Sequence, residues 1–187
     1  APLVYKGNKV DCPVCEKSFK KFLSYGSNVA HRDNVLCPYD LTLERHRLMW
    51  VYLKDKSNFF TEDNLKVMHI APEQCFYSKF KKQNNLEYTT GDLLSPLADI
   101  HFDLHKIPLE DNQYDVIFCN HVLEHVEDDH KCITELHRIM NSGGWGIFQV
   151  PIDTSRSETY EDASITAPAE RKKHFWQYGH VRLYGLD

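Results

Sequence analysis

Between residues 66 and 150 the hydrophobic and polar positions alternate between two patterns, one typical of buried strands and one of amphipathic helices. Strands are short apolar runs bounded by turn-forming residues, whereas helices repeat apolar positions every three or four residues. We predict strands at 66–70, 86–90, 100–102, 114–119 and 146–150, and helices at 74–84 and 129–140. Strands that alternate with helices form a parallel sheet with helices on its faces, so this part of the chain predicts an α/β fold.

The first 40 residues follow no helical period and are rich in Lys, Asn, Pro and Cys, which indicates turns and short strands. A helix is expected next, at 43–54, with Thr42 as its N-cap. The run from Leu48 to Leu53 is apolar nearly all round. We therefore expect this helix to be buried on more than one side.

Two short cysteine motifs lie in this N-terminal part, CPVC at 12–15 and CPYD at 37–40, with 21 residues between them. Two CxxC turns at about this spacing form a tetrahedral zinc site. The predicted ligands are Cys12, Cys15, Cys37 and Asp40. His31 or His46 could replace the carboxylate, and a vestigial site with three free thiols is the alternative. The zinc would be structural, because four protein ligands leave no open coordination position and a short Cys-rich segment needs a staple.

Acidic residues follow two strands of the predicted sheet. Asp92 comes about 20 residues after the first strand, where nucleotide-binding sheets place an acid that accepts hydrogen bonds from ribose hydroxyls. Asp103 follows the third strand, where a carboxylate can accept a hydrogen bond from an adenine amine. Either could be an ordinary turn residue, but together they favour an adenosine ligand. The first strand ends in HIAPE without a glycine-rich turn, which argues against a diphosphate ligand.

Five segments together resemble a class I S-adenosylmethionine-dependent methyltransferase family of bacteria. They are VMHIAPE, TTGDL, FDLHKIPLEDNQYDVIFCNHVLEHV, ELHRIMNSGGWGIFQVP and HVRLYGLD. The resemblance covers nearly the whole chain and implies a Rossmann-like methyltransferase fold, with helices on both faces of a mostly parallel sheet and S-adenosylmethionine as the cofactor. The family's usual final helix and antiparallel strand pair do not follow Asp187, so we expect the chain to lack the last strands.

The resemblance also implies roles for individual residues. It places the methionine side of the cofactor against Ala71, Pro72 and Glu73, the ribose on Asp92 and the adenine on Asp103. Two positions depart from mainstream class I enzymes, since His69 and Glu73 stand where those enzymes have an acid and a glycine.

On the same resemblance, Asn120 and His121 would face the transferred methyl group. If the acceptor must lose a proton, His121 and His180 are the candidate bases. His121 and His125 are four residues apart, a spacing that can place two metal ligands on one helix face. We favour a packing or capping role for His125, because no third ligand stands out at a recognised spacing.

The tail from His174 to Asp187 is aromatic and cationic. It could form a wall of the acceptor pocket, with Arg182 binding an acidic group of the acceptor or a carboxylate of the core. It could instead complete the hydrophobic core, in which case Trp176 would be buried and costly to remove.

Composition adds a charge asymmetry. The net charge is −5, but residues 1–56 carry ten Lys or Arg against six Asp or Glu, a net of +4 that leaves −9 for the rest. This argues against nucleic acid as the main partner without excluding a phosphate-bearing partner of the N-terminal part. No apolar run is long enough to span a membrane, and no signal peptide begins the chain, so we expect a cytoplasmic protein with reduced cysteines.

We therefore predict two parts, a zinc module with its connecting helix at 1–56 and a methyltransferase core with a substrate-side segment at 57–187. The expected reaction is methyl transfer from S-adenosylmethionine to an N, O or S acceptor that the sequence does not identify. The alternatives are a catalytically silent nucleoside-binding protein, and an adaptor whose zinc module recruits nucleic acid or protein.

Overall fold

The structure is a computed structural model that describes residues 2–26, 31–62 and 64–187. Contacts divide the chain into two compact units. The first unit combines residues 1–63 with 73–85, and the second combines 64–72 with 86–187. This grouping is one of spatial contacts, and the predicted division at residue 56 stays a prediction.

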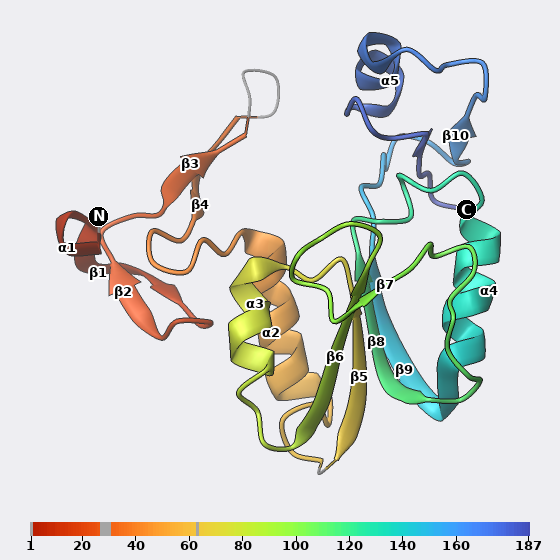
Figure 1. Ribbon diagram of the computed structural model, residues 1–187. Coiled ribbons are helices and arrows are strands. Elements are labelled where there is room, and N and C mark those ends of the chain that lie inside the picture. Colours follow the sequence, from red (N-terminus) through yellow and green to blue (C-terminus); the bar gives the residue numbers. More distant parts are fainter. Residues whose placement is uncertain (1, 27–30, 63) are drawn as a thin grey trace. The chain divides into compact units, whose positions relative to one another are not determined.

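The second unit is built on a five-stranded sheet with the strand order β7-β6-β5-β8-β9 (Figure 1). All four pairings in the sheet are parallel. The strands are β5 Leu65–Ile70, β6 Leu86–Asp92, β7 Ile100–His101, β8 Tyr114–Asn120 and β9 Met140–Gln149. The predicted parallel α/β sheet is thus confirmed, with each predicted strand matched to within a few residues apart from an earlier start of β9.

Helix α4 (Asp129–Ile139) covers this sheet with one apolar face, but Ile133, which the helical period of the sequence also assigns to that face, is 44% exposed. The helix begins at Asp128, whose Oδ1 accepts a hydrogen bond from the Lys131 amide at 2.9 Å. Its buried positions join the strand residues Met68, Ile70, Ile117 and Cys119 in one core. The helix contributes Cys132, Leu136 and Ile139 to that core. Burial of these apolar side chains fixes the face that α4 turns to the sheet.

The glycine pair 143–144 lies within β9 and not at the end of α4, where Met140 is the C-cap. Pairing between β8 and β9 jumps from Tyr114 with Met140 to Val116 with Trp145, so residues 141–144 form a bulge within β9. Gly143 has a φ of +82°, a left-handed conformation that glycine adopts without steric cost. The strand therefore starts directly after the helix.

In its described residues, the first unit contains two small antiparallel sheets and three helices. Its elements are α1 Pro2–Tyr5, β1 Lys6–Cys12, β2 Lys17–Phe19, β3 Leu23–Tyr25, β4 Arg32–Leu36, α2 Glu44–Lys56 and α3 Gln74–Phe80. β1 pairs with β2, and β3 pairs with β4. Aromatic rings join the two longer helices, because Trp50 of α2 stacks on Phe76 and Phe80 of α3 at centroid distances of 6.3 and 6.2 Å.

Two expectations about α2 are wrong. Its N-cap is Leu43, while the hydroxyl of Thr42 donates a hydrogen bond to Asp40 instead of capping the helix. The helix is also buried on one side only, since Met49 and Leu53 are buried whereas Leu48 and Tyr52 are 68% and 47% exposed. An all-round apolar stretch of six residues therefore does not imply all-round burial. Helix α3 is shorter than predicted and ends at Phe80.

The residues after β9 form a small structured segment. It contains β10 Tyr160–Glu161, α5 Pro168–Phe175 and β11 Arg182–Leu183, and β10 pairs with β11 in antiparallel fashion.

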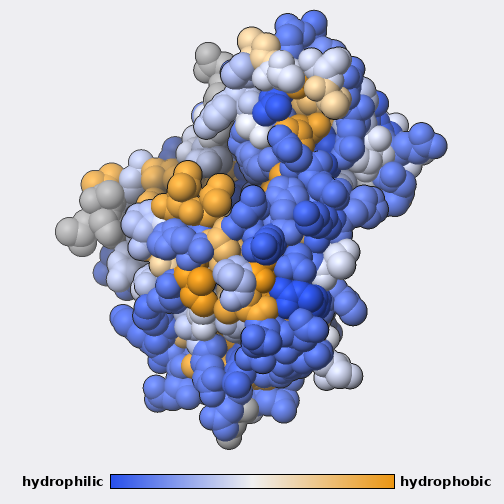
Figure 2. Space-filling view, turned by 45° about the vertical axis from the view of Figure 1, so that its right-hand side comes forward, coloured by the Kyte–Doolittle hydropathy of each residue, from blue (hydrophilic) through white to orange (hydrophobic). Residues whose placement is uncertain are grey.

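In the space-filling view most of the visible surface is hydrophilic, with hydrophobic side chains in a few groups (Figure 2). Among the described residues, no helix is long and apolar enough to cross a membrane.

Candidate functional site

The carboxyl ends of the three central strands meet at one edge of the sheet. Ile70 ends β5 and pairs with Gly91 on β6 and with Cys119 on β8. The polar residues Asp92 and Asn120, which end these two neighbours, therefore lie at the same edge. Ligands of open parallel sheets bind at this edge, so the structure brings together there several residues that the sequence singled out.

Two turns at this edge have unusual backbone conformations. Ala71, directly after β5, has a φ of +48°, and His121, directly after β8, has a φ of +56°. The Ala71 amide donates to Gly91 at 2.8 Å and the His121 amide donates to Gln149 at 2.7 Å. A left-handed conformation costs a non-glycine residue about 1–2 kcal/mol, and such strain concentrates at functional sites.

The two predicted acids both organise turns. Asp92 Oδ1 accepts hydrogen bonds from the amides of Leu94 and Ser95, each at 2.7 Å. Asp103 Oδ1 accepts from the amide and the ring of His105 at 2.9 and 2.7 Å, and these bonds lower the pKa of Asp103. The turn role that the sequence left open is thus present at both positions. It uses one oxygen of each carboxylate in the described part of the chain, and the second oxygen of each can still accept a hydrogen bond.

Asn120 and His121 lead into a turn that also holds Glu124, a residue that the sequence analysis missed. Asn120 and Glu124 are buried, at 4% and 1% exposure. The Nδ1 atom of His121 lies 3.2 Å from Glu124 Oε1. Within the described chain, the His121 Nε2 atom is buried and has no hydrogen-bond partner. A carboxylate that holds one ring nitrogen of a histidine leaves the other nitrogen poised to accept a proton.

The tail contributes two buried polar residues to this turn, His180 and Arg182, at 6% and 2% exposure. The Arg182 guanidinium donates to the carbonyls of Leu123 and Val126 at 2.6 Å each, and it pairs with the carboxylate of Glu161. Of the two roles considered for Arg182, the structure shows the pairing with a carboxylate of the core, because its Nε also lies 3.5 Å from Oδ2 of Asp129 on α4.

The interpretation of the tail as simple core is wrong for its largest side chain. Trp176 is 53% exposed and Tyr178 is 68% exposed, whereas Phe175 is fully buried. Trp176 adopts a left-handed conformation with a φ of +70° at the end of α5, which turns the chain back toward His180. The tail is therefore anchored by Phe175 and Arg182, while Trp176 and Tyr178 lie at the surface, and the predicted pocket wall stays a prediction.

The two cysteine motifs fold into turns of the same kind. In the first, the Glu16 amide donates to the Cys12 carbonyl at 2.8 Å, and in the second, the Leu41 amide donates to Cys37 at 3.0 Å. The residue after each motif is left-handed, with φ values of +56° at Glu16 and +59° at Leu41. Asp40 therefore occupies in the second turn the place that a cysteine occupies in the first.

These turns bring the four predicted zinc ligands together, with their ligand atoms within 4.8 Å of one another. Cys15 Sγ lies 3.8 Å from Cys37 Sγ, and Cys12 Sγ lies 3.6 Å from Asp40 Oδ2. Thiolates bound to one tetrahedral zinc at about 2.3 Å would be roughly 3.8 Å apart, which fits this spacing. Hydrogen bonding to Cys37 lowers the pKa of Cys12 to about 6.

The histidines that could have replaced Asp40 bond elsewhere. His31 Nε2 lies 3.1 Å from Asp33. His46 Nδ1 accepts from the Leu43 amide at 3.1 Å, and its Nε2 lies 3.8 Å from Glu73.

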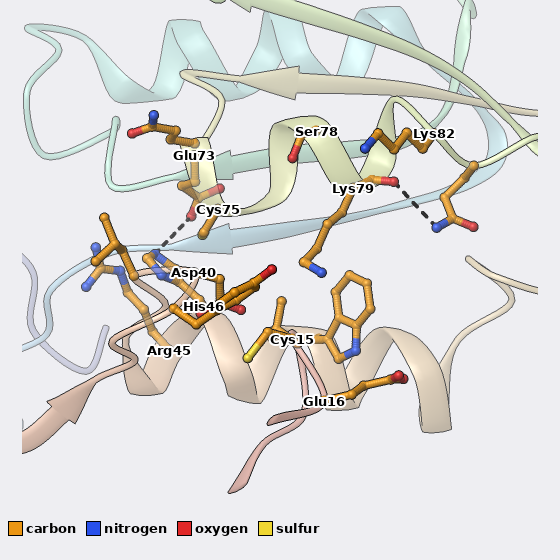
Figure 3. A pocket seen from close by; sticks show the side chains of 16 residues that line it. Cys15, Glu16, Asp40, Arg45, His46, Glu73, Cys75, Ser78, Lys79 and Lys82 are labelled. Carbon is orange, nitrogen blue, oxygen red and sulfur yellow. Dashed lines mark hydrogen bonds and ion pairs between the residues drawn. The ribbon is translucent and has the colours of Figure 1, made fainter. Parts of the chain in front are cut away.

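Within the first unit, a cavity of about 900 Å³ lies beside these residues (Figure 3). Its lining includes Cys15 and Asp40 from the cysteine turns, His46 from α2, and Glu73 and Lys79 from the start and end of α3. Glu73, which was predicted on the methionine side of the cofactor, is the N-cap of α3 and points toward His46. The cavity thus presents both acidic and basic groups to a ligand.

Comparison with known proteins supports the fold. A family model described as a methyltransferase domain matches residues 57–148. The comparison with curated proteins gives no match.

Among solved structures, the YcgJ protein of Bacillus subtilis matches with 14% identity over 76% of this chain and 64% of its own, at a TM-score of 0.52. The [4+2]-cyclase SpnF matches with 12% identity over 66% of this chain and 50% of its own, at a TM-score of 0.50. A candidate S-adenosyl-L-methionine-dependent methyltransferase of Methanococcus maripaludis shares 21% identity over 49% of this chain and 50% of its own, at a TM-score of 0.43.

The chain therefore spans half to about two thirds of the length of these structures. Together with the parallel sheet, these matches show a Rossmann-like methyltransferase fold that carries a cysteine cluster near its N-terminus.

Proposed function

We propose that this protein transfers the methyl group of S-adenosylmethionine to an acceptor. The observation that carries the proposal is the shared edge of β5, β6 and β8, where Ala71, Asp92 and Asn120 meet within a sequence segment that matches a methyltransferase domain. Bound there, the cofactor supplies an electrophilic methyl group on a sulfonium. Methyl transfer by in-line displacement needs mainly positioning and exclusion of water.

The residues at this edge take the following roles in the proposal. The tight turn at Ala71 and Pro72 admits the methionine side of the cofactor next to the backbone, and Glu73 follows it in the chain. Asp92 accepts hydrogen bonds from the ribose, and Asp103 accepts one from the adenine amine. His121, oriented by the Glu124 carboxylate at 3.2 Å, takes the acceptor's proton where one must be lost.

The cofactor proposal is tested with Asp92→Asn and S-adenosylhomocysteine. An asparagine keeps one carbonyl oxygen for the Leu94 and Ser95 amides, so the turn stays intact, but its NH₂ group cannot accept a bond from the ribose. We expect calorimetry to show affinity weaker by about 1–3 kcal/mol, roughly 5- to 150-fold, because a buried ribose hydroxyl loses its acceptor.

The matched control is Asp162→Asn, since Asp162 Oδ1 caps Ser164 in a similar turn. Equal affinity of Asp92→Asn and wild type would disprove the ribose assignment, and no binding by wild type would disprove the methyltransferase proposal itself.

A second function is compatible with the same fold. One matching structure is named as a [4+2]-cyclase, so this fold does not by itself imply methyl transfer. The turn after β5, which lacks the usual glycines, and the buried His69, which stands where mainstream enzymes have an acid, favour a nucleoside-binding protein without turnover as the alternative. Binding of S-adenosylhomocysteine without transfer from radiolabelled S-adenosylmethionine to any acceptor would support it.

We also propose that Cys12, Cys15, Cys37 and Asp40 hold a structural zinc ion. The support is the pair of equivalent turns and the 3.8 Å spacing of the Cys15 and Cys37 sulfurs. Four protein ligands complete a tetrahedral shell, so the ion would stabilise the hairpins without taking part in chemistry. For the protein as a whole, we propose a cytoplasmic location and an acceptor that is still to be identified. We propose no main role for nucleic acid or a membrane.

A further inference from the structure

Three side chains that can bind metals converge at the turn after β8, far from the cysteines in sequence. Ligand atoms of Glu124, His125 and His180 all lie within 4.8 Å of one another. His180 Nε2 lies 4.0 Å from Glu124 Oε1. The rings of His125 and His180 are 4.7 Å apart between centroids and nearly perpendicular, at 83°. Two imidazoles and one carboxylate thus face a common point.

Hydrogen bonds fix which nitrogen of each ring is available. His180 Nδ1 lies 2.8 Å from the Phe175 carbonyl, and His125 Nδ1 lies 3.0 Å from the Gly179 carbonyl. A carbonyl oxygen can only accept, so each Nδ1 carries a proton and each Nε2 of the neutral ring presents a lone pair. Metal-binding histidines are oriented in the same way, with the second nitrogen donating to a backbone carbonyl or a carboxylate.

Glu124 provides the negative charge. Its side chain is 1% exposed, and its Oε2 atom has no hydrogen-bond partner among the residues that the structure describes. Its Oε1 atom is held by His121 Nδ1 at 3.2 Å, which orients the carboxylate. A buried carboxylate oxygen without a partner is unfavourable, and a bound cation would satisfy it.

The tail holds His180 in this place despite 55 residues of intervening chain. The Val181 amide donates to the Glu124 carbonyl at 2.9 Å, and Arg182 donates to the Leu123 and Val126 carbonyls on either side of the turn. The third ligand is therefore positioned by a rigid contact on the ligand-bearing turn itself.

We propose that Glu124, His125 and His180 form a binding site for a divalent transition metal, with zinc as the first candidate. Imidazole and carboxylate ligands suit first-row divalent ions of this kind. Three protein ligands leave at least one coordination position open, which is typical of catalytic metal sites and unlike the cysteine cluster. Ligand atoms at about 2.0–2.2 Å from zinc lie roughly 3.3 Å apart, so the three groups would close by about an ångström, and the exposed His125 ring can move.

The site is tested by titrating the metal-free full chain with Co²⁺, which replaces zinc and reports its ligands in the absorption spectrum. Thiolate ligands give intense sulfur-to-cobalt charge-transfer bands, whereas nitrogen and oxygen ligands give only weak d–d bands. We expect a weak-band component that is lost, or weakened at least ~10-fold in affinity, in His125→Ala and in Glu124→Gln.

The matched control is His130→Ala, which removes an exposed histidine that does not belong to the cluster. It should leave both the weak d–d bands and the thiolate charge-transfer bands unchanged. His125 is itself exposed, so its variant keeps the fold even where Glu124→Gln does not. Identical titrations of His125→Ala and His130→Ala would overturn the proposal. Because the thiolate bands report the cysteine cluster separately, and neither component requires cofactor binding, the outcome does not depend on the proposed methyl transfer.

Discussion

The two candidate metal sites are built in opposite ways. The cysteine cluster of Cys12, Cys15, Cys37 and Asp40 is made by two local turns, each closed by one hydrogen bond across four residues. The histidine cluster of Glu124, His125 and His180 is made when the tail packs on the turn after β8.

The cysteine region depends on its ligands more than on a hydrophobic core, because the hairpins around the cysteines are short and mostly exposed. In the histidine cluster, the hydrophobic core and the buried Arg182 hold the segments that carry the ligands in place. Loss of metal should therefore unfold the first region but leave the second folded.

The largest effect is expected for Cys12→Ser. A structural zinc contributes about 10 kcal/mol or more to the folding of a small module, so loss of one thiolate should empty the site and unfold the two hairpins while the parallel sheet persists. Metal analysis and segment-resolved amide hydrogen exchange measure both consequences. Cys75→Ser is the control, because Cys75 is a free cysteine outside the cluster. If Cys12→Ser kept the zinc content and the hydrogen exchange of the wild type, the cysteine region would not depend on a metal bound by Cys12.

The next effect, about 3–5 kcal/mol, is expected for Arg182→Ala. The substitution removes a buried cation and leaves the Leu123 and Val126 carbonyls and the carboxylate of Glu161 without their donor. Denaturant unfolding measures the loss. The control is Arg156→Ala, a half-exposed arginine whose ion pair with Asp153 should contribute less than about 1 kcal/mol. If the loss of stability in Arg182→Ala were as small as the loss expected for Arg156→Ala, the tail would not depend on its arginine anchor.

The same contrast explains which features could be predicted from sequence. Strands β5 and β8 could be predicted because most of their residues are apolar, as in a buried parallel strand, and the cysteine turns because their ligands are three residues apart. Spacing along the chain carried both signals.

The histidine cluster could not be found in that way. The sequence shows His121 and His125 as a pair four residues apart, but the ring that packs against His125 belongs to His180, which lies in the tail. Glu124 gave no signal either, because a lone acid among apolar residues looks like a surface position. The exposure of Leu48 was missed for a related reason, since burial depends on what packs against a helix and not only on its composition.

The smallest effect is expected at the edge of the sheet, where the backbone of Ala71 is strained and neither candidate metal site is involved. Ala71→Gly places the residue best suited to a φ of +48° at the turn after β5. Relief of about 1–2 kcal/mol of steric cost is partly offset by the roughly 0.5–1 kcal/mol that glycine adds to the entropy of the unfolded chain. We expect a net stabilisation of about 0–1.5 kcal/mol, measured as a rise in the denaturant midpoint at an unchanged slope. Ala169→Gly in the exposed first turn of α5 is the control and should destabilise by up to about 1 kcal/mol. Equal destabilisation by the two substitutions would show that Ala71 is not strained, and the case for this turn as part of the cofactor site would then rest on its position in the sheet alone.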